Sequence, residues 1–314
     1  PEPDLSIGAL ATVDGAKRTD AVVNVTKEFG PYASISGYAT LRDDRGTQNT
    51  SLGSNLFSRW GNFWGSSELA LTKDDGVQDS AGALSVAYDA PKWFVLLRHI
   101  WVEPDFNPAL GLIPFTDRRG PYLFAEHQNE FRTGPVRELN VNTFWEYVEH
   151  FDGRPFMRSA SVEASIETRH DLEFGVQYER ASFEGERDET IQLSAGFNVS
   201  NRFKRFEIGY QTGTLSDEPA TFLNFEGSYR AFGEVDLGIA SSLFRFMGTE
   251  RQSIFTVGWE MDAQRSLTGR YVQRNGASNW YVTYRSAGFS GMDLFVILGD
   301  PNTDSFERRL SVKL

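Results

Sequence analysis

The feature that most constrains this chain is a strict alternation of residue types from Ile191 to Ser200. Its apolar members are Ile191, Leu193, Ala195, Phe197 and Val199, and the residues between them are polar or glycine. Because successive side chains of a strand point to opposite faces, the segment predicts a strand with one apolar and one polar face. The same pattern returns at 223–230 and 255–262, and no helical period of comparable length competes with it. Every such apolar face must be covered, which favours a β-barrel in a membrane.

The alternation recurs along most of the chain and predicts roughly nineteen strand segments. They are placed at 5–14, 20–28, 32–42, 61–73, 80–89, 92–102, 120–132, 136–149, 155–168, 170–182, 188–200, 202–214, 219–232, 234–246, 250–262, 265–274, 277–286, 291–299 and 305–314. Many match the length of a tilted membrane strand, about nine to eleven residues. Single-chain bacterial barrels usually have an even number of strands, so we expect about eighteen, with sixteen to twenty acceptable.

The expected fold class is therefore all-β, a closed antiparallel up-and-down transmembrane β-barrel. No linker or composition shift divides the chain, so residues 1–314 are expected to form one domain. Six apolar side chains are predicted to face lipid: Leu223, Phe225, Tyr229, Phe255, Val257 and Trp259. The alternative is a soluble β-sandwich or propeller with these residues in a core. A sandwich needs interruptions every 8–12 residues, whereas the segments here run longer.

Most connections between the segments are short and rich in turn-forming residues, such as Asp152-Gly153 and Asn275-Gly276. Short turns force neighbouring strands to pair antiparallel. Two connections are expected to be long, Asp43–Trp60 and Glu103–Gly120. Because three predicted strands separate them, they should emerge on opposite sides of the membrane.

Composition narrows the function classes. The formal net charge is -12 and the pI is about 4.9, which argues against a nucleic-acid partner because phosphate binding needs a basic stripe. A mean hydropathy of -0.39 with 24% charged residues resembles a soluble protein, yet the inside of a barrel is also polar. Pro1 is not followed by the charged start and apolar core of a signal peptide, so we expect a mature or trimmed form of an integral outer-membrane protein.

One segment carries a resemblance to a known family. The stretch Phe106–Asp117, which begins Phe-Asn-Pro and contains Gly111, resembles the Phe-Asn-Pro…Gly-Phe-x-x-Arg-x-Asp hallmark of an outer-membrane barrel domain of unknown function. That domain typically follows a carbohydrate-binding family 9-like domain in Gram-negative proteins. In this chain Phe115 stands near the place where the family usually has a basic residue. The resemblance implies an outer-membrane barrel in contact with lipid and lipopolysaccharide, points to glycan-related biology, and implies no reaction.

Charged residues on the polar strand faces are the first group of candidate site residues. They are Glu163, Glu167, Glu173, Glu226, Arg230, Asp236, Glu260, Asp262, Arg270 and Arg285. In a water-filled lumen, facing rows of acids and bases would create a field that selects solutes. The alternative is that they pair across neighbouring strands and merely keep the lumen solvated.

The long connection after residue 102 supplies the second group: Phe106, Asn107, Pro108, Gly111, Pro114 and Asp117. Loops of this length without secondary structure are often functional, so the segment is expected either to fold into the lumen as a plug or constriction or to dock a protein partner. The alternative is a rigid turn at the rim, shaped by Asn107-Pro108 and Gly111.

Catalytic and metal-binding chemistry is not indicated. The histidines His99, His127, His150 and His170 share no metal-ligand spacing, and no Gly-x-Ser-x-Gly motif occurs. Acidic turns such as Asp74-Asp75 could bind calcium, but Asp is also an ordinary turn former. We therefore expect no enzyme activity, metal or cofactor. The expected function is a porin-like channel or glycan-related transport component with an acidic lumen. The alternative is a structural anchor that holds a partner in a larger envelope complex.

Overall fold

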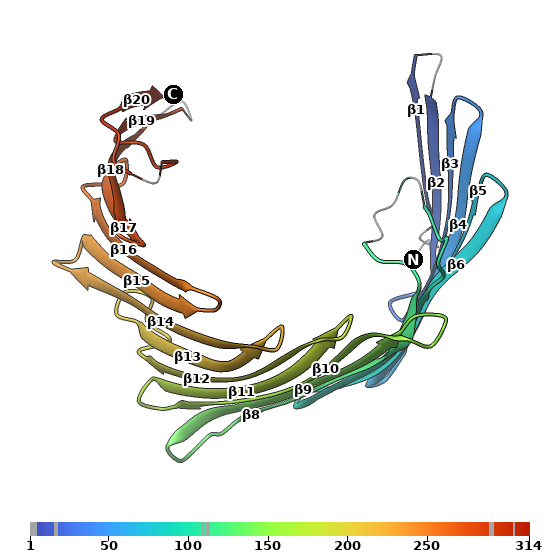
Figure 1. Ribbon diagram of the computed structural model, residues 1–314, viewed down its shortest axis with the longest axis horizontal. Helices are drawn as coiled ribbons and strands as arrows, with labels where there is room; N and C mark the ends of the chain where they lie inside the picture. The colour runs from blue at the N-terminus through green and yellow to red at the C-terminus, as the bar shows by residue number, and fades with distance from the viewer. Residues whose placement is uncertain (1–4, 16–17, 109, 111–113, 289–291, 304) are drawn as a thin grey trace. The chain divides into compact units, whose positions relative to one another are not determined.

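The computed structural model describes residues 5–15, 18–108, 110, 114–288, 292–303 and 305–314, and these residues form an all-β structure (Figure 1). Its twenty strands are β1 (Leu5–Asp14), β2 (Arg18–Glu28), β3 (Ala33–Asp44), β4 (Thr47–Trp60), β5 (Phe63–Asp74), β6 (Val77–Ala90), β7 (Trp93–Val102), β8 (Arg118–Glu130), β9 (Val136–Glu149), β10 (Pro155–Thr168), β11 (Leu172–Phe183), β12 (Glu186–Phe197), β13 (Phe206–Leu215), β14 (Glu218–Ala231), β15 (Val235–Arg245), β16 (Thr249–Glu260), β17 (Arg265–Arg274), β18 (Ala277–Ala287), β19 (Asp293–Leu298) and β20 (Leu310–Lys313). Each strand pairs with the next one along the chain, which makes an antiparallel up-and-down meander. The all-β, up-and-down part of the expected fold is thus confirmed.

The strand count is twenty rather than eighteen, at the upper end of the expected range. All nineteen predicted segments contain a strand, and Asp43–Trp60, expected to be a long connection, contributes one more. Residues 47–60 form β4, which pairs with β3 and β5. A two-residue turn at Arg45 and Gly46 joins it to β3, and both residues have positive φ, 54° and 93°. The prediction that two long connections emerge on opposite sides is therefore wrong, because only one of the two, the connection after β7, is long.

Close backbone contacts divide the chain into two compact units, which are described separately. Unit 1 comprises Pro1–Gln128, Val141–Val162 and Arg180–Glu186, and unit 2 comprises Asn129–Asn140, Glu163–Glu179 and Arg187–Leu314. The expectation of one domain over 1–314 stays a prediction. No helix long and apolar enough to cross a membrane occurs in the described part of the chain.

In unit 1 the two faces of the sheet differ in side-chain size, and β6 shows this most clearly. Ala81, Ala83, Ser85 and Ala87 are buried, whereas the intervening Leu84 and Val86 are exposed. The exposed apolar face continues on the neighbouring strands with Leu71 and Leu97. We call the other face, which carries Ala81 and Ala83, the loop-bearing face, because the connection from β7 to β8 packs on it.

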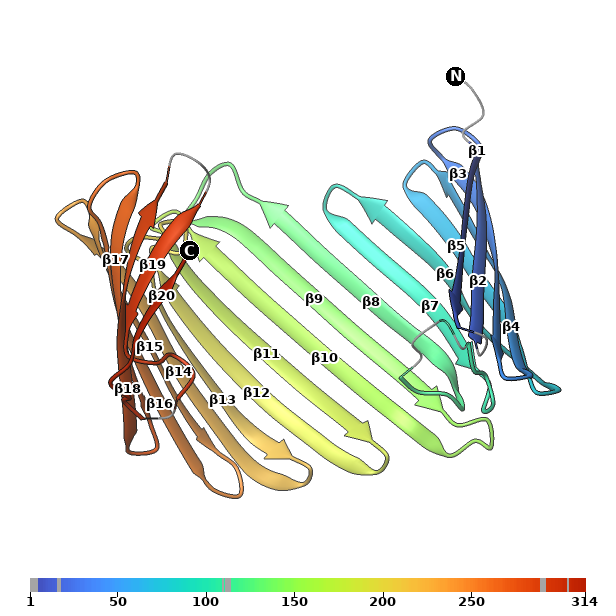
Figure 2. The same cartoon turned by 90° about the horizontal axis from the view of Figure 1, so that it is seen from above.

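Unit 2 also has two different faces, which its register defines. Tyr229, Leu237 and Val257 are opposite one another on β14, β15 and β16 and lie on the apolar face. The neighbouring register row, Arg230 with Asp236, lies on the opposite face, which we call the charged face. Of the six residues predicted to face lipid, all lie on the apolar face; five are exposed and Phe225 is half-buried. Figure 2 shows these strands side by side.

The tight turns follow from local sequence. At Asn275-Gly276, between β17 and β18, φ is 48° and 90°, the backbone of a type I′ hairpin turn. Asn and Gly tolerate positive φ better than other residues, so the sequence favours a two-residue hairpin here. The expected turns at Asp152-Gly153 and Asn275-Gly276 are confirmed.

Candidate functional site

The connection from β7 to β8 lies over the loop-bearing face of unit 1 (Figure 1). It comprises residues 103–117 and so ends three residues earlier than the expected Glu103–Gly120. Asn107 holds it in place. Its Nδ2 donates to Asp74 Oδ2 at 2.7 Å, its backbone N–H donates to Thr72 Oγ1 at 3.4 Å, and its carbonyl oxygen accepts from Asn49 Nδ2 at 2.6 Å. One asparagine therefore ties the connection to both β4 and β5.

Phe106 provides the apolar part of this contact. Its side chain is 4% exposed and forms a small core with Ala81 and Val102, with Ala70 packed against them. The alanines of β5 and β6 leave the room that the ring occupies. Small residues on this face and a large ring in the connection are therefore complementary, which favours packing over the sheet rather than a rigid turn at the rim.

The second half of the connection is bound to another pair of strands. The Asp117 carboxylate lies 3.0 Å from His150 Nδ1 and accepts the backbone N–H of Phe151, also at 3.0 Å. His150 Nε2 lies 3.5 Å from Glu184 Oε1. Phe115 adds ring contacts with Phe156 and Phe183, with ring centroids 5.6 and 6.0 Å apart. Both ends of the connection are thus fixed to the sheet.

A cavity of about 590 Å³ opens between the first half of the connection and the sheet of unit 1. Phe106, Pro108 and Leu110 line it on the side of the connection. On the sheet side, Glu68, Arg98 and Arg118 contribute charge, and Tyr38 contributes an aromatic ring. The Tyr38 ring lies over Gly53, where an added Cβ would come within 2.2 Å of it, so only glycine leaves room for the ring.

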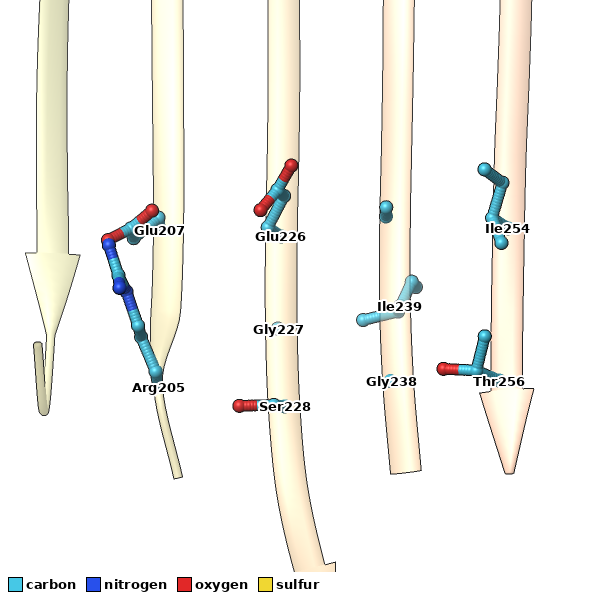
Figure 3. A pocket seen from close by; sticks show the side chains of 10 residues that line it. Arg205, Glu207, Glu226, Gly227, Ser228, Gly238, Ile239, Ile254 and Thr256 are labelled. Carbon is cyan, nitrogen blue, oxygen red and sulfur yellow. The ribbon is translucent and has the colours of Figure 1, made fainter. Parts of the chain in front are cut away.

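The charged face of unit 2 carries an acidic row. Glu207 on β13 is directly opposite Glu226 on β14, an arrangement that is unfavourable for two like charges. Arg205 forms an ion pair with Glu207, and Figure 3 shows the two side chains facing each other with Glu226 on the neighbouring strand. Glu173 continues the row, because Glu173 and Glu207 both lie 3.6 Å from the position of a Cβ on Gly196. A pocket of about 280 Å³ lies beside Arg205, Glu207 and Glu226.

Several of the predicted charged candidates form ion pairs, either with one another or with other residues. Arg230 Nη2 lies 2.6 Å from Asp236 Oδ2 and 3.7 Å from Glu260 Oε2. Arg285 Nη2 lies 2.7 Å from Asp293 Oδ2, and Glu167 forms an ion pair with Arg137. For these residues the interpretation that charges pair across neighbouring strands is confirmed. That these residues face a lumen stays a prediction.

The other charged candidates have different surroundings. Glu226 makes no ion pair among the described residues, and Arg270 Nε is buried without a hydrogen-bond partner. Glu163 is exposed on β10 and Glu173 is half-buried on β11. The register places Glu226, Arg270 and Arg285 on the same face as Arg230.

The expectation for Asp262 is wrong in one respect. β16 ends at Glu260, so Asp262 lies in the turn to β17 and not on a strand face. Its pKa is below the ordinary value because the Arg265 side chain donates a hydrogen bond to it, with a further bond from the backbone of Gln264. Asp262 thus acts as a turn former. These hydrogen bonds explain why an aspartate stands at this position of the turn, with no need for a role in solute selection.

Of the six candidates in the connection, Phe106, Asn107 and Asp117 make the contacts described above. Pro108 lines the cavity, and Pro114 is exposed. Gly111 lies outside the described residues. Sequence reasoning missed the residues that receive the connection, above all Asn49 and Thr72, and missed Ser51, Arg98 and Arg118 around the cavity. The one sequence signal that could have revealed Asn49 was the polar run in β4, but this run was interpreted as part of a loop.

Comparisons with known proteins give no relative: no protein-family model matches the chain, and no curated protein matches it either. Among the described residues, no group of three or more His, Cys, Asp or Glu side chains is arranged to hold a metal ion. Unit 1 thus carries a connection fixed over one sheet face with a cavity beneath it, and unit 2 carries an acidic row on its charged face.

Proposed function

We propose that the chain forms a closed β-barrel in the bacterial outer membrane and acts as a porin-like, cation-preferring channel. The observation that carries this proposal is the packing of the β7–β8 connection against the sheet face opposite the exposed apolar side chains. In a barrel whose apolar face meets lipid, that connection would lie inside the lumen and narrow it. A lumen lined by about twenty strands is wide enough for water unless something fills it.

The membrane setting is supported by the large exposed apolar side chains that alternate along the strands, such as Leu84, Val86 and Leu97 of unit 1. Exposure of so many large apolar groups to water is unfavourable, whereas lipid solvates them. We expect the protein to require detergent for extraction from cell envelopes. A protein that leaves cells in buffer alone and remains monodisperse contradicts the barrel and supports a soluble β-sheet protein.

Cation preference is supported by the acidic row. Glu207 and Glu226 are cross-strand neighbours, and Arg205 alone among these three residues carries positive charge. Charged side chains that line a pore select ions of opposite sign. If the charged face lines the lumen, this row would concentrate cations there. Glycan-related transport, which the resemblance of the Phe106–Asp117 stretch implies, is compatible with such a lumen for neutral or cationic sugars.

The test is single-channel recording in planar bilayers under a KCl gradient. We expect stable open steps that prefer K⁺ over Cl⁻. The double variant Glu207→Gln/Glu226→Gln removes two negative charges and leaves Arg205 without its carboxylate. The K⁺/Cl⁻ permeability ratio should therefore fall, on the order of twofold or more.

The matched control is Arg230→Gln/Asp236→Asn, which removes an ion pair from the same face without changing the net charge. Its permeability ratio should equal that of the unmodified protein. Equal ratios for all three proteins contradict the role of the acidic row. The recordings are repeated after residues 106–114 are replaced by a short Gly-Ser linker, which keeps Asp117. Silence in both forms, with co-purification of a fixed protein partner, overturns the channel and supports the structural anchor.

A further inference from the structure

We infer that the cavity between the β7–β8 connection and the sheet of unit 1 is a binding site for an amphipathic monocarboxylate, with an apolar body and a single carboxylate. This inference concerns unit 1 alone and does not depend on ion conduction. The cavity, at about 590 Å³, has the size of a small-molecule site. Most of its lining is apolar, including Ile100, Val102, Phe106 and Leu110. Such a lining favours an apolar body in the occupant.

Polar atoms around the cavity lack hydrogen-bond partners. Ser51 is 1% exposed, lines the cavity, and its Oγ has no partner. The Nε atoms of Arg98 and Arg118, which line the same cavity, are also buried without a partner. Buried polar side-chain atoms are hydrogen-bonded in the large majority of cases. Three strands lie between Ser51 on β4 and Arg118 on β8, and Arg98 is four residues from the partner of Arg118 on β7, so one head group can reach only one of these atoms. Arg118 Nε therefore lacks an acceptor that an occupant of the cavity can supply.

The charged residues of the lining define the sign and the magnitude of the charge expected on the head group. Arg98 Nη2 lies 3.4 Å from Glu68 Oε2, so these two charges offset each other. Arg118 stacks over Phe115 at 5.9 Å and makes no ion pair among the described residues. The charged lining thus has one positive charge in excess, which fits a monoanion. A carboxylate has one negative charge, whereas a phosphate monoester has about -1.5 to -2 at neutral pH.

The register gives the direction of the apolar body. Arg118 is opposite Val102 on β7, and Arg98 lies four residues earlier on the same strand and on the same face. At about 3.3 Å per residue, the two positions are roughly 13 Å apart. Ile100 lies between them. A medium-length alkyl chain with its carboxylate at Arg118 would extend along Ile100 towards Arg98.

The test is calorimetric titration of the protein in lipid nanodiscs with decanoate, with empty nanodiscs subtracted. We expect saturable binding at one site. Decan-1-ol has the same chain without the charge and should bind more weakly, and decyltrimethylammonium should not bind. Arg118→Gln should lower the affinity for decanoate by about tenfold or more. Arg119→Gln is the control and should leave it unchanged, because Arg119 is paired with Glu149 at 3.0 Å.

Ile100→Ser is the second variant, and it serves also if Arg118→Gln fails to insert. It truncates the apolar side chain that lies between Arg118 and Arg98 and lines the cavity, so the affinity for decanoate should fall. Absence of saturable binding above empty nanodiscs overturns the inference, as does equal binding of decanoate and decan-1-ol. Binding that neither Arg118→Gln nor Ile100→Ser changes also overturns it. Conductance is recorded separately, so a silent protein that binds decanoate contradicts the channel and supports this site.

Discussion

Phe106→Ala is expected to release the β7–β8 connection from the sheet. The ring is 4% exposed and packs against Ala81 and Val102, so its removal leaves a void that small side chains cannot fill. Truncation of a buried Phe costs about 3–5 kcal/mol. The cost should be local, because the connection opens without loss of a strand. Limited proteolysis with a protease of broad specificity measures this local cost. Cleavage within 103–117 should be at least about a hundredfold faster than in the unmodified protein, because the cleavage rate follows the population of the open form.

Phe115→Ala is the matched control in the same connection. Phe115 is 46% exposed, so truncation of its ring should accelerate cleavage much less. Asn107→Ala, which loses the bond to Asp74 at 2.7 Å, should have an intermediate effect. Equal cleavage rates in the unmodified protein and in Phe106→Ala contradict the docked connection. A larger effect from Phe115 than from Phe106 indicates that the second half of the connection holds it in place.

Val257→Arg is expected to have the second large effect, on the free energy of unfolding in a membrane. Val257 is 47% exposed on the apolar face, three residues before the end of β16. If this face meets lipid, an arginine near the bilayer midplane costs about 2–4 kcal/mol. The measurement is urea titration of the protein refolded into lipid vesicles, with heat-modifiable mobility as the readout of the folded form.

Gly258→Arg is the control for Val257→Arg, one residue further along β16. It places the same side chain on the charged face, where the nearest side-chain atom to the new Cβ is Asp236 Cβ at 3.9 Å. The space is open and a carboxylate is close, so the cost should be small. A reversed order, with Gly258→Arg more destabilising than Val257→Arg, means that the charged face meets lipid. A shift of one residue exchanges the two faces of a strand, so the pair is sensitive to orientation.

Part of the fold was accessible from sequence because the information is local. The alternation at 223–230 and 255–262 predicts two-faced strands, and the structure has β14 and β16 there. Asn275-Gly276 predicts a hairpin turn from the backbone preferences of two residues. β4 shows where this reasoning fails. Its first half, from Thr47 to Ser51, is polar on both faces, and Arg45-Gly46 is a weaker turn signal than Asn-Gly, so the segment looked like a loop.

The candidate site was accessible only in part. The Phe106–Asp117 stretch stood out by its prolines and its resemblance, but its contacts did not. Asn107 bonds to Asn49, Thr72 and Asp74, which are 58, 35 and 33 residues away. The sequence did not decide whether Arg230 pairs with Asp236, because each of them could equally be an unpaired charge in a lumen.

The sequence by itself determined the strand content, the two-faced character of the strands and the positions of the tight turns. These depend on the period of two in a strand and on the φ preferences of single residues, which neighbouring positions reveal. The tertiary structure alone decided that Ser51, Arg98 and Arg118 surround one cavity and that Glu207 is opposite Glu226. Such contacts depend on the register of several strands at once. One additional strand, such as β4, changes which residues share a face and which lie beneath the connection.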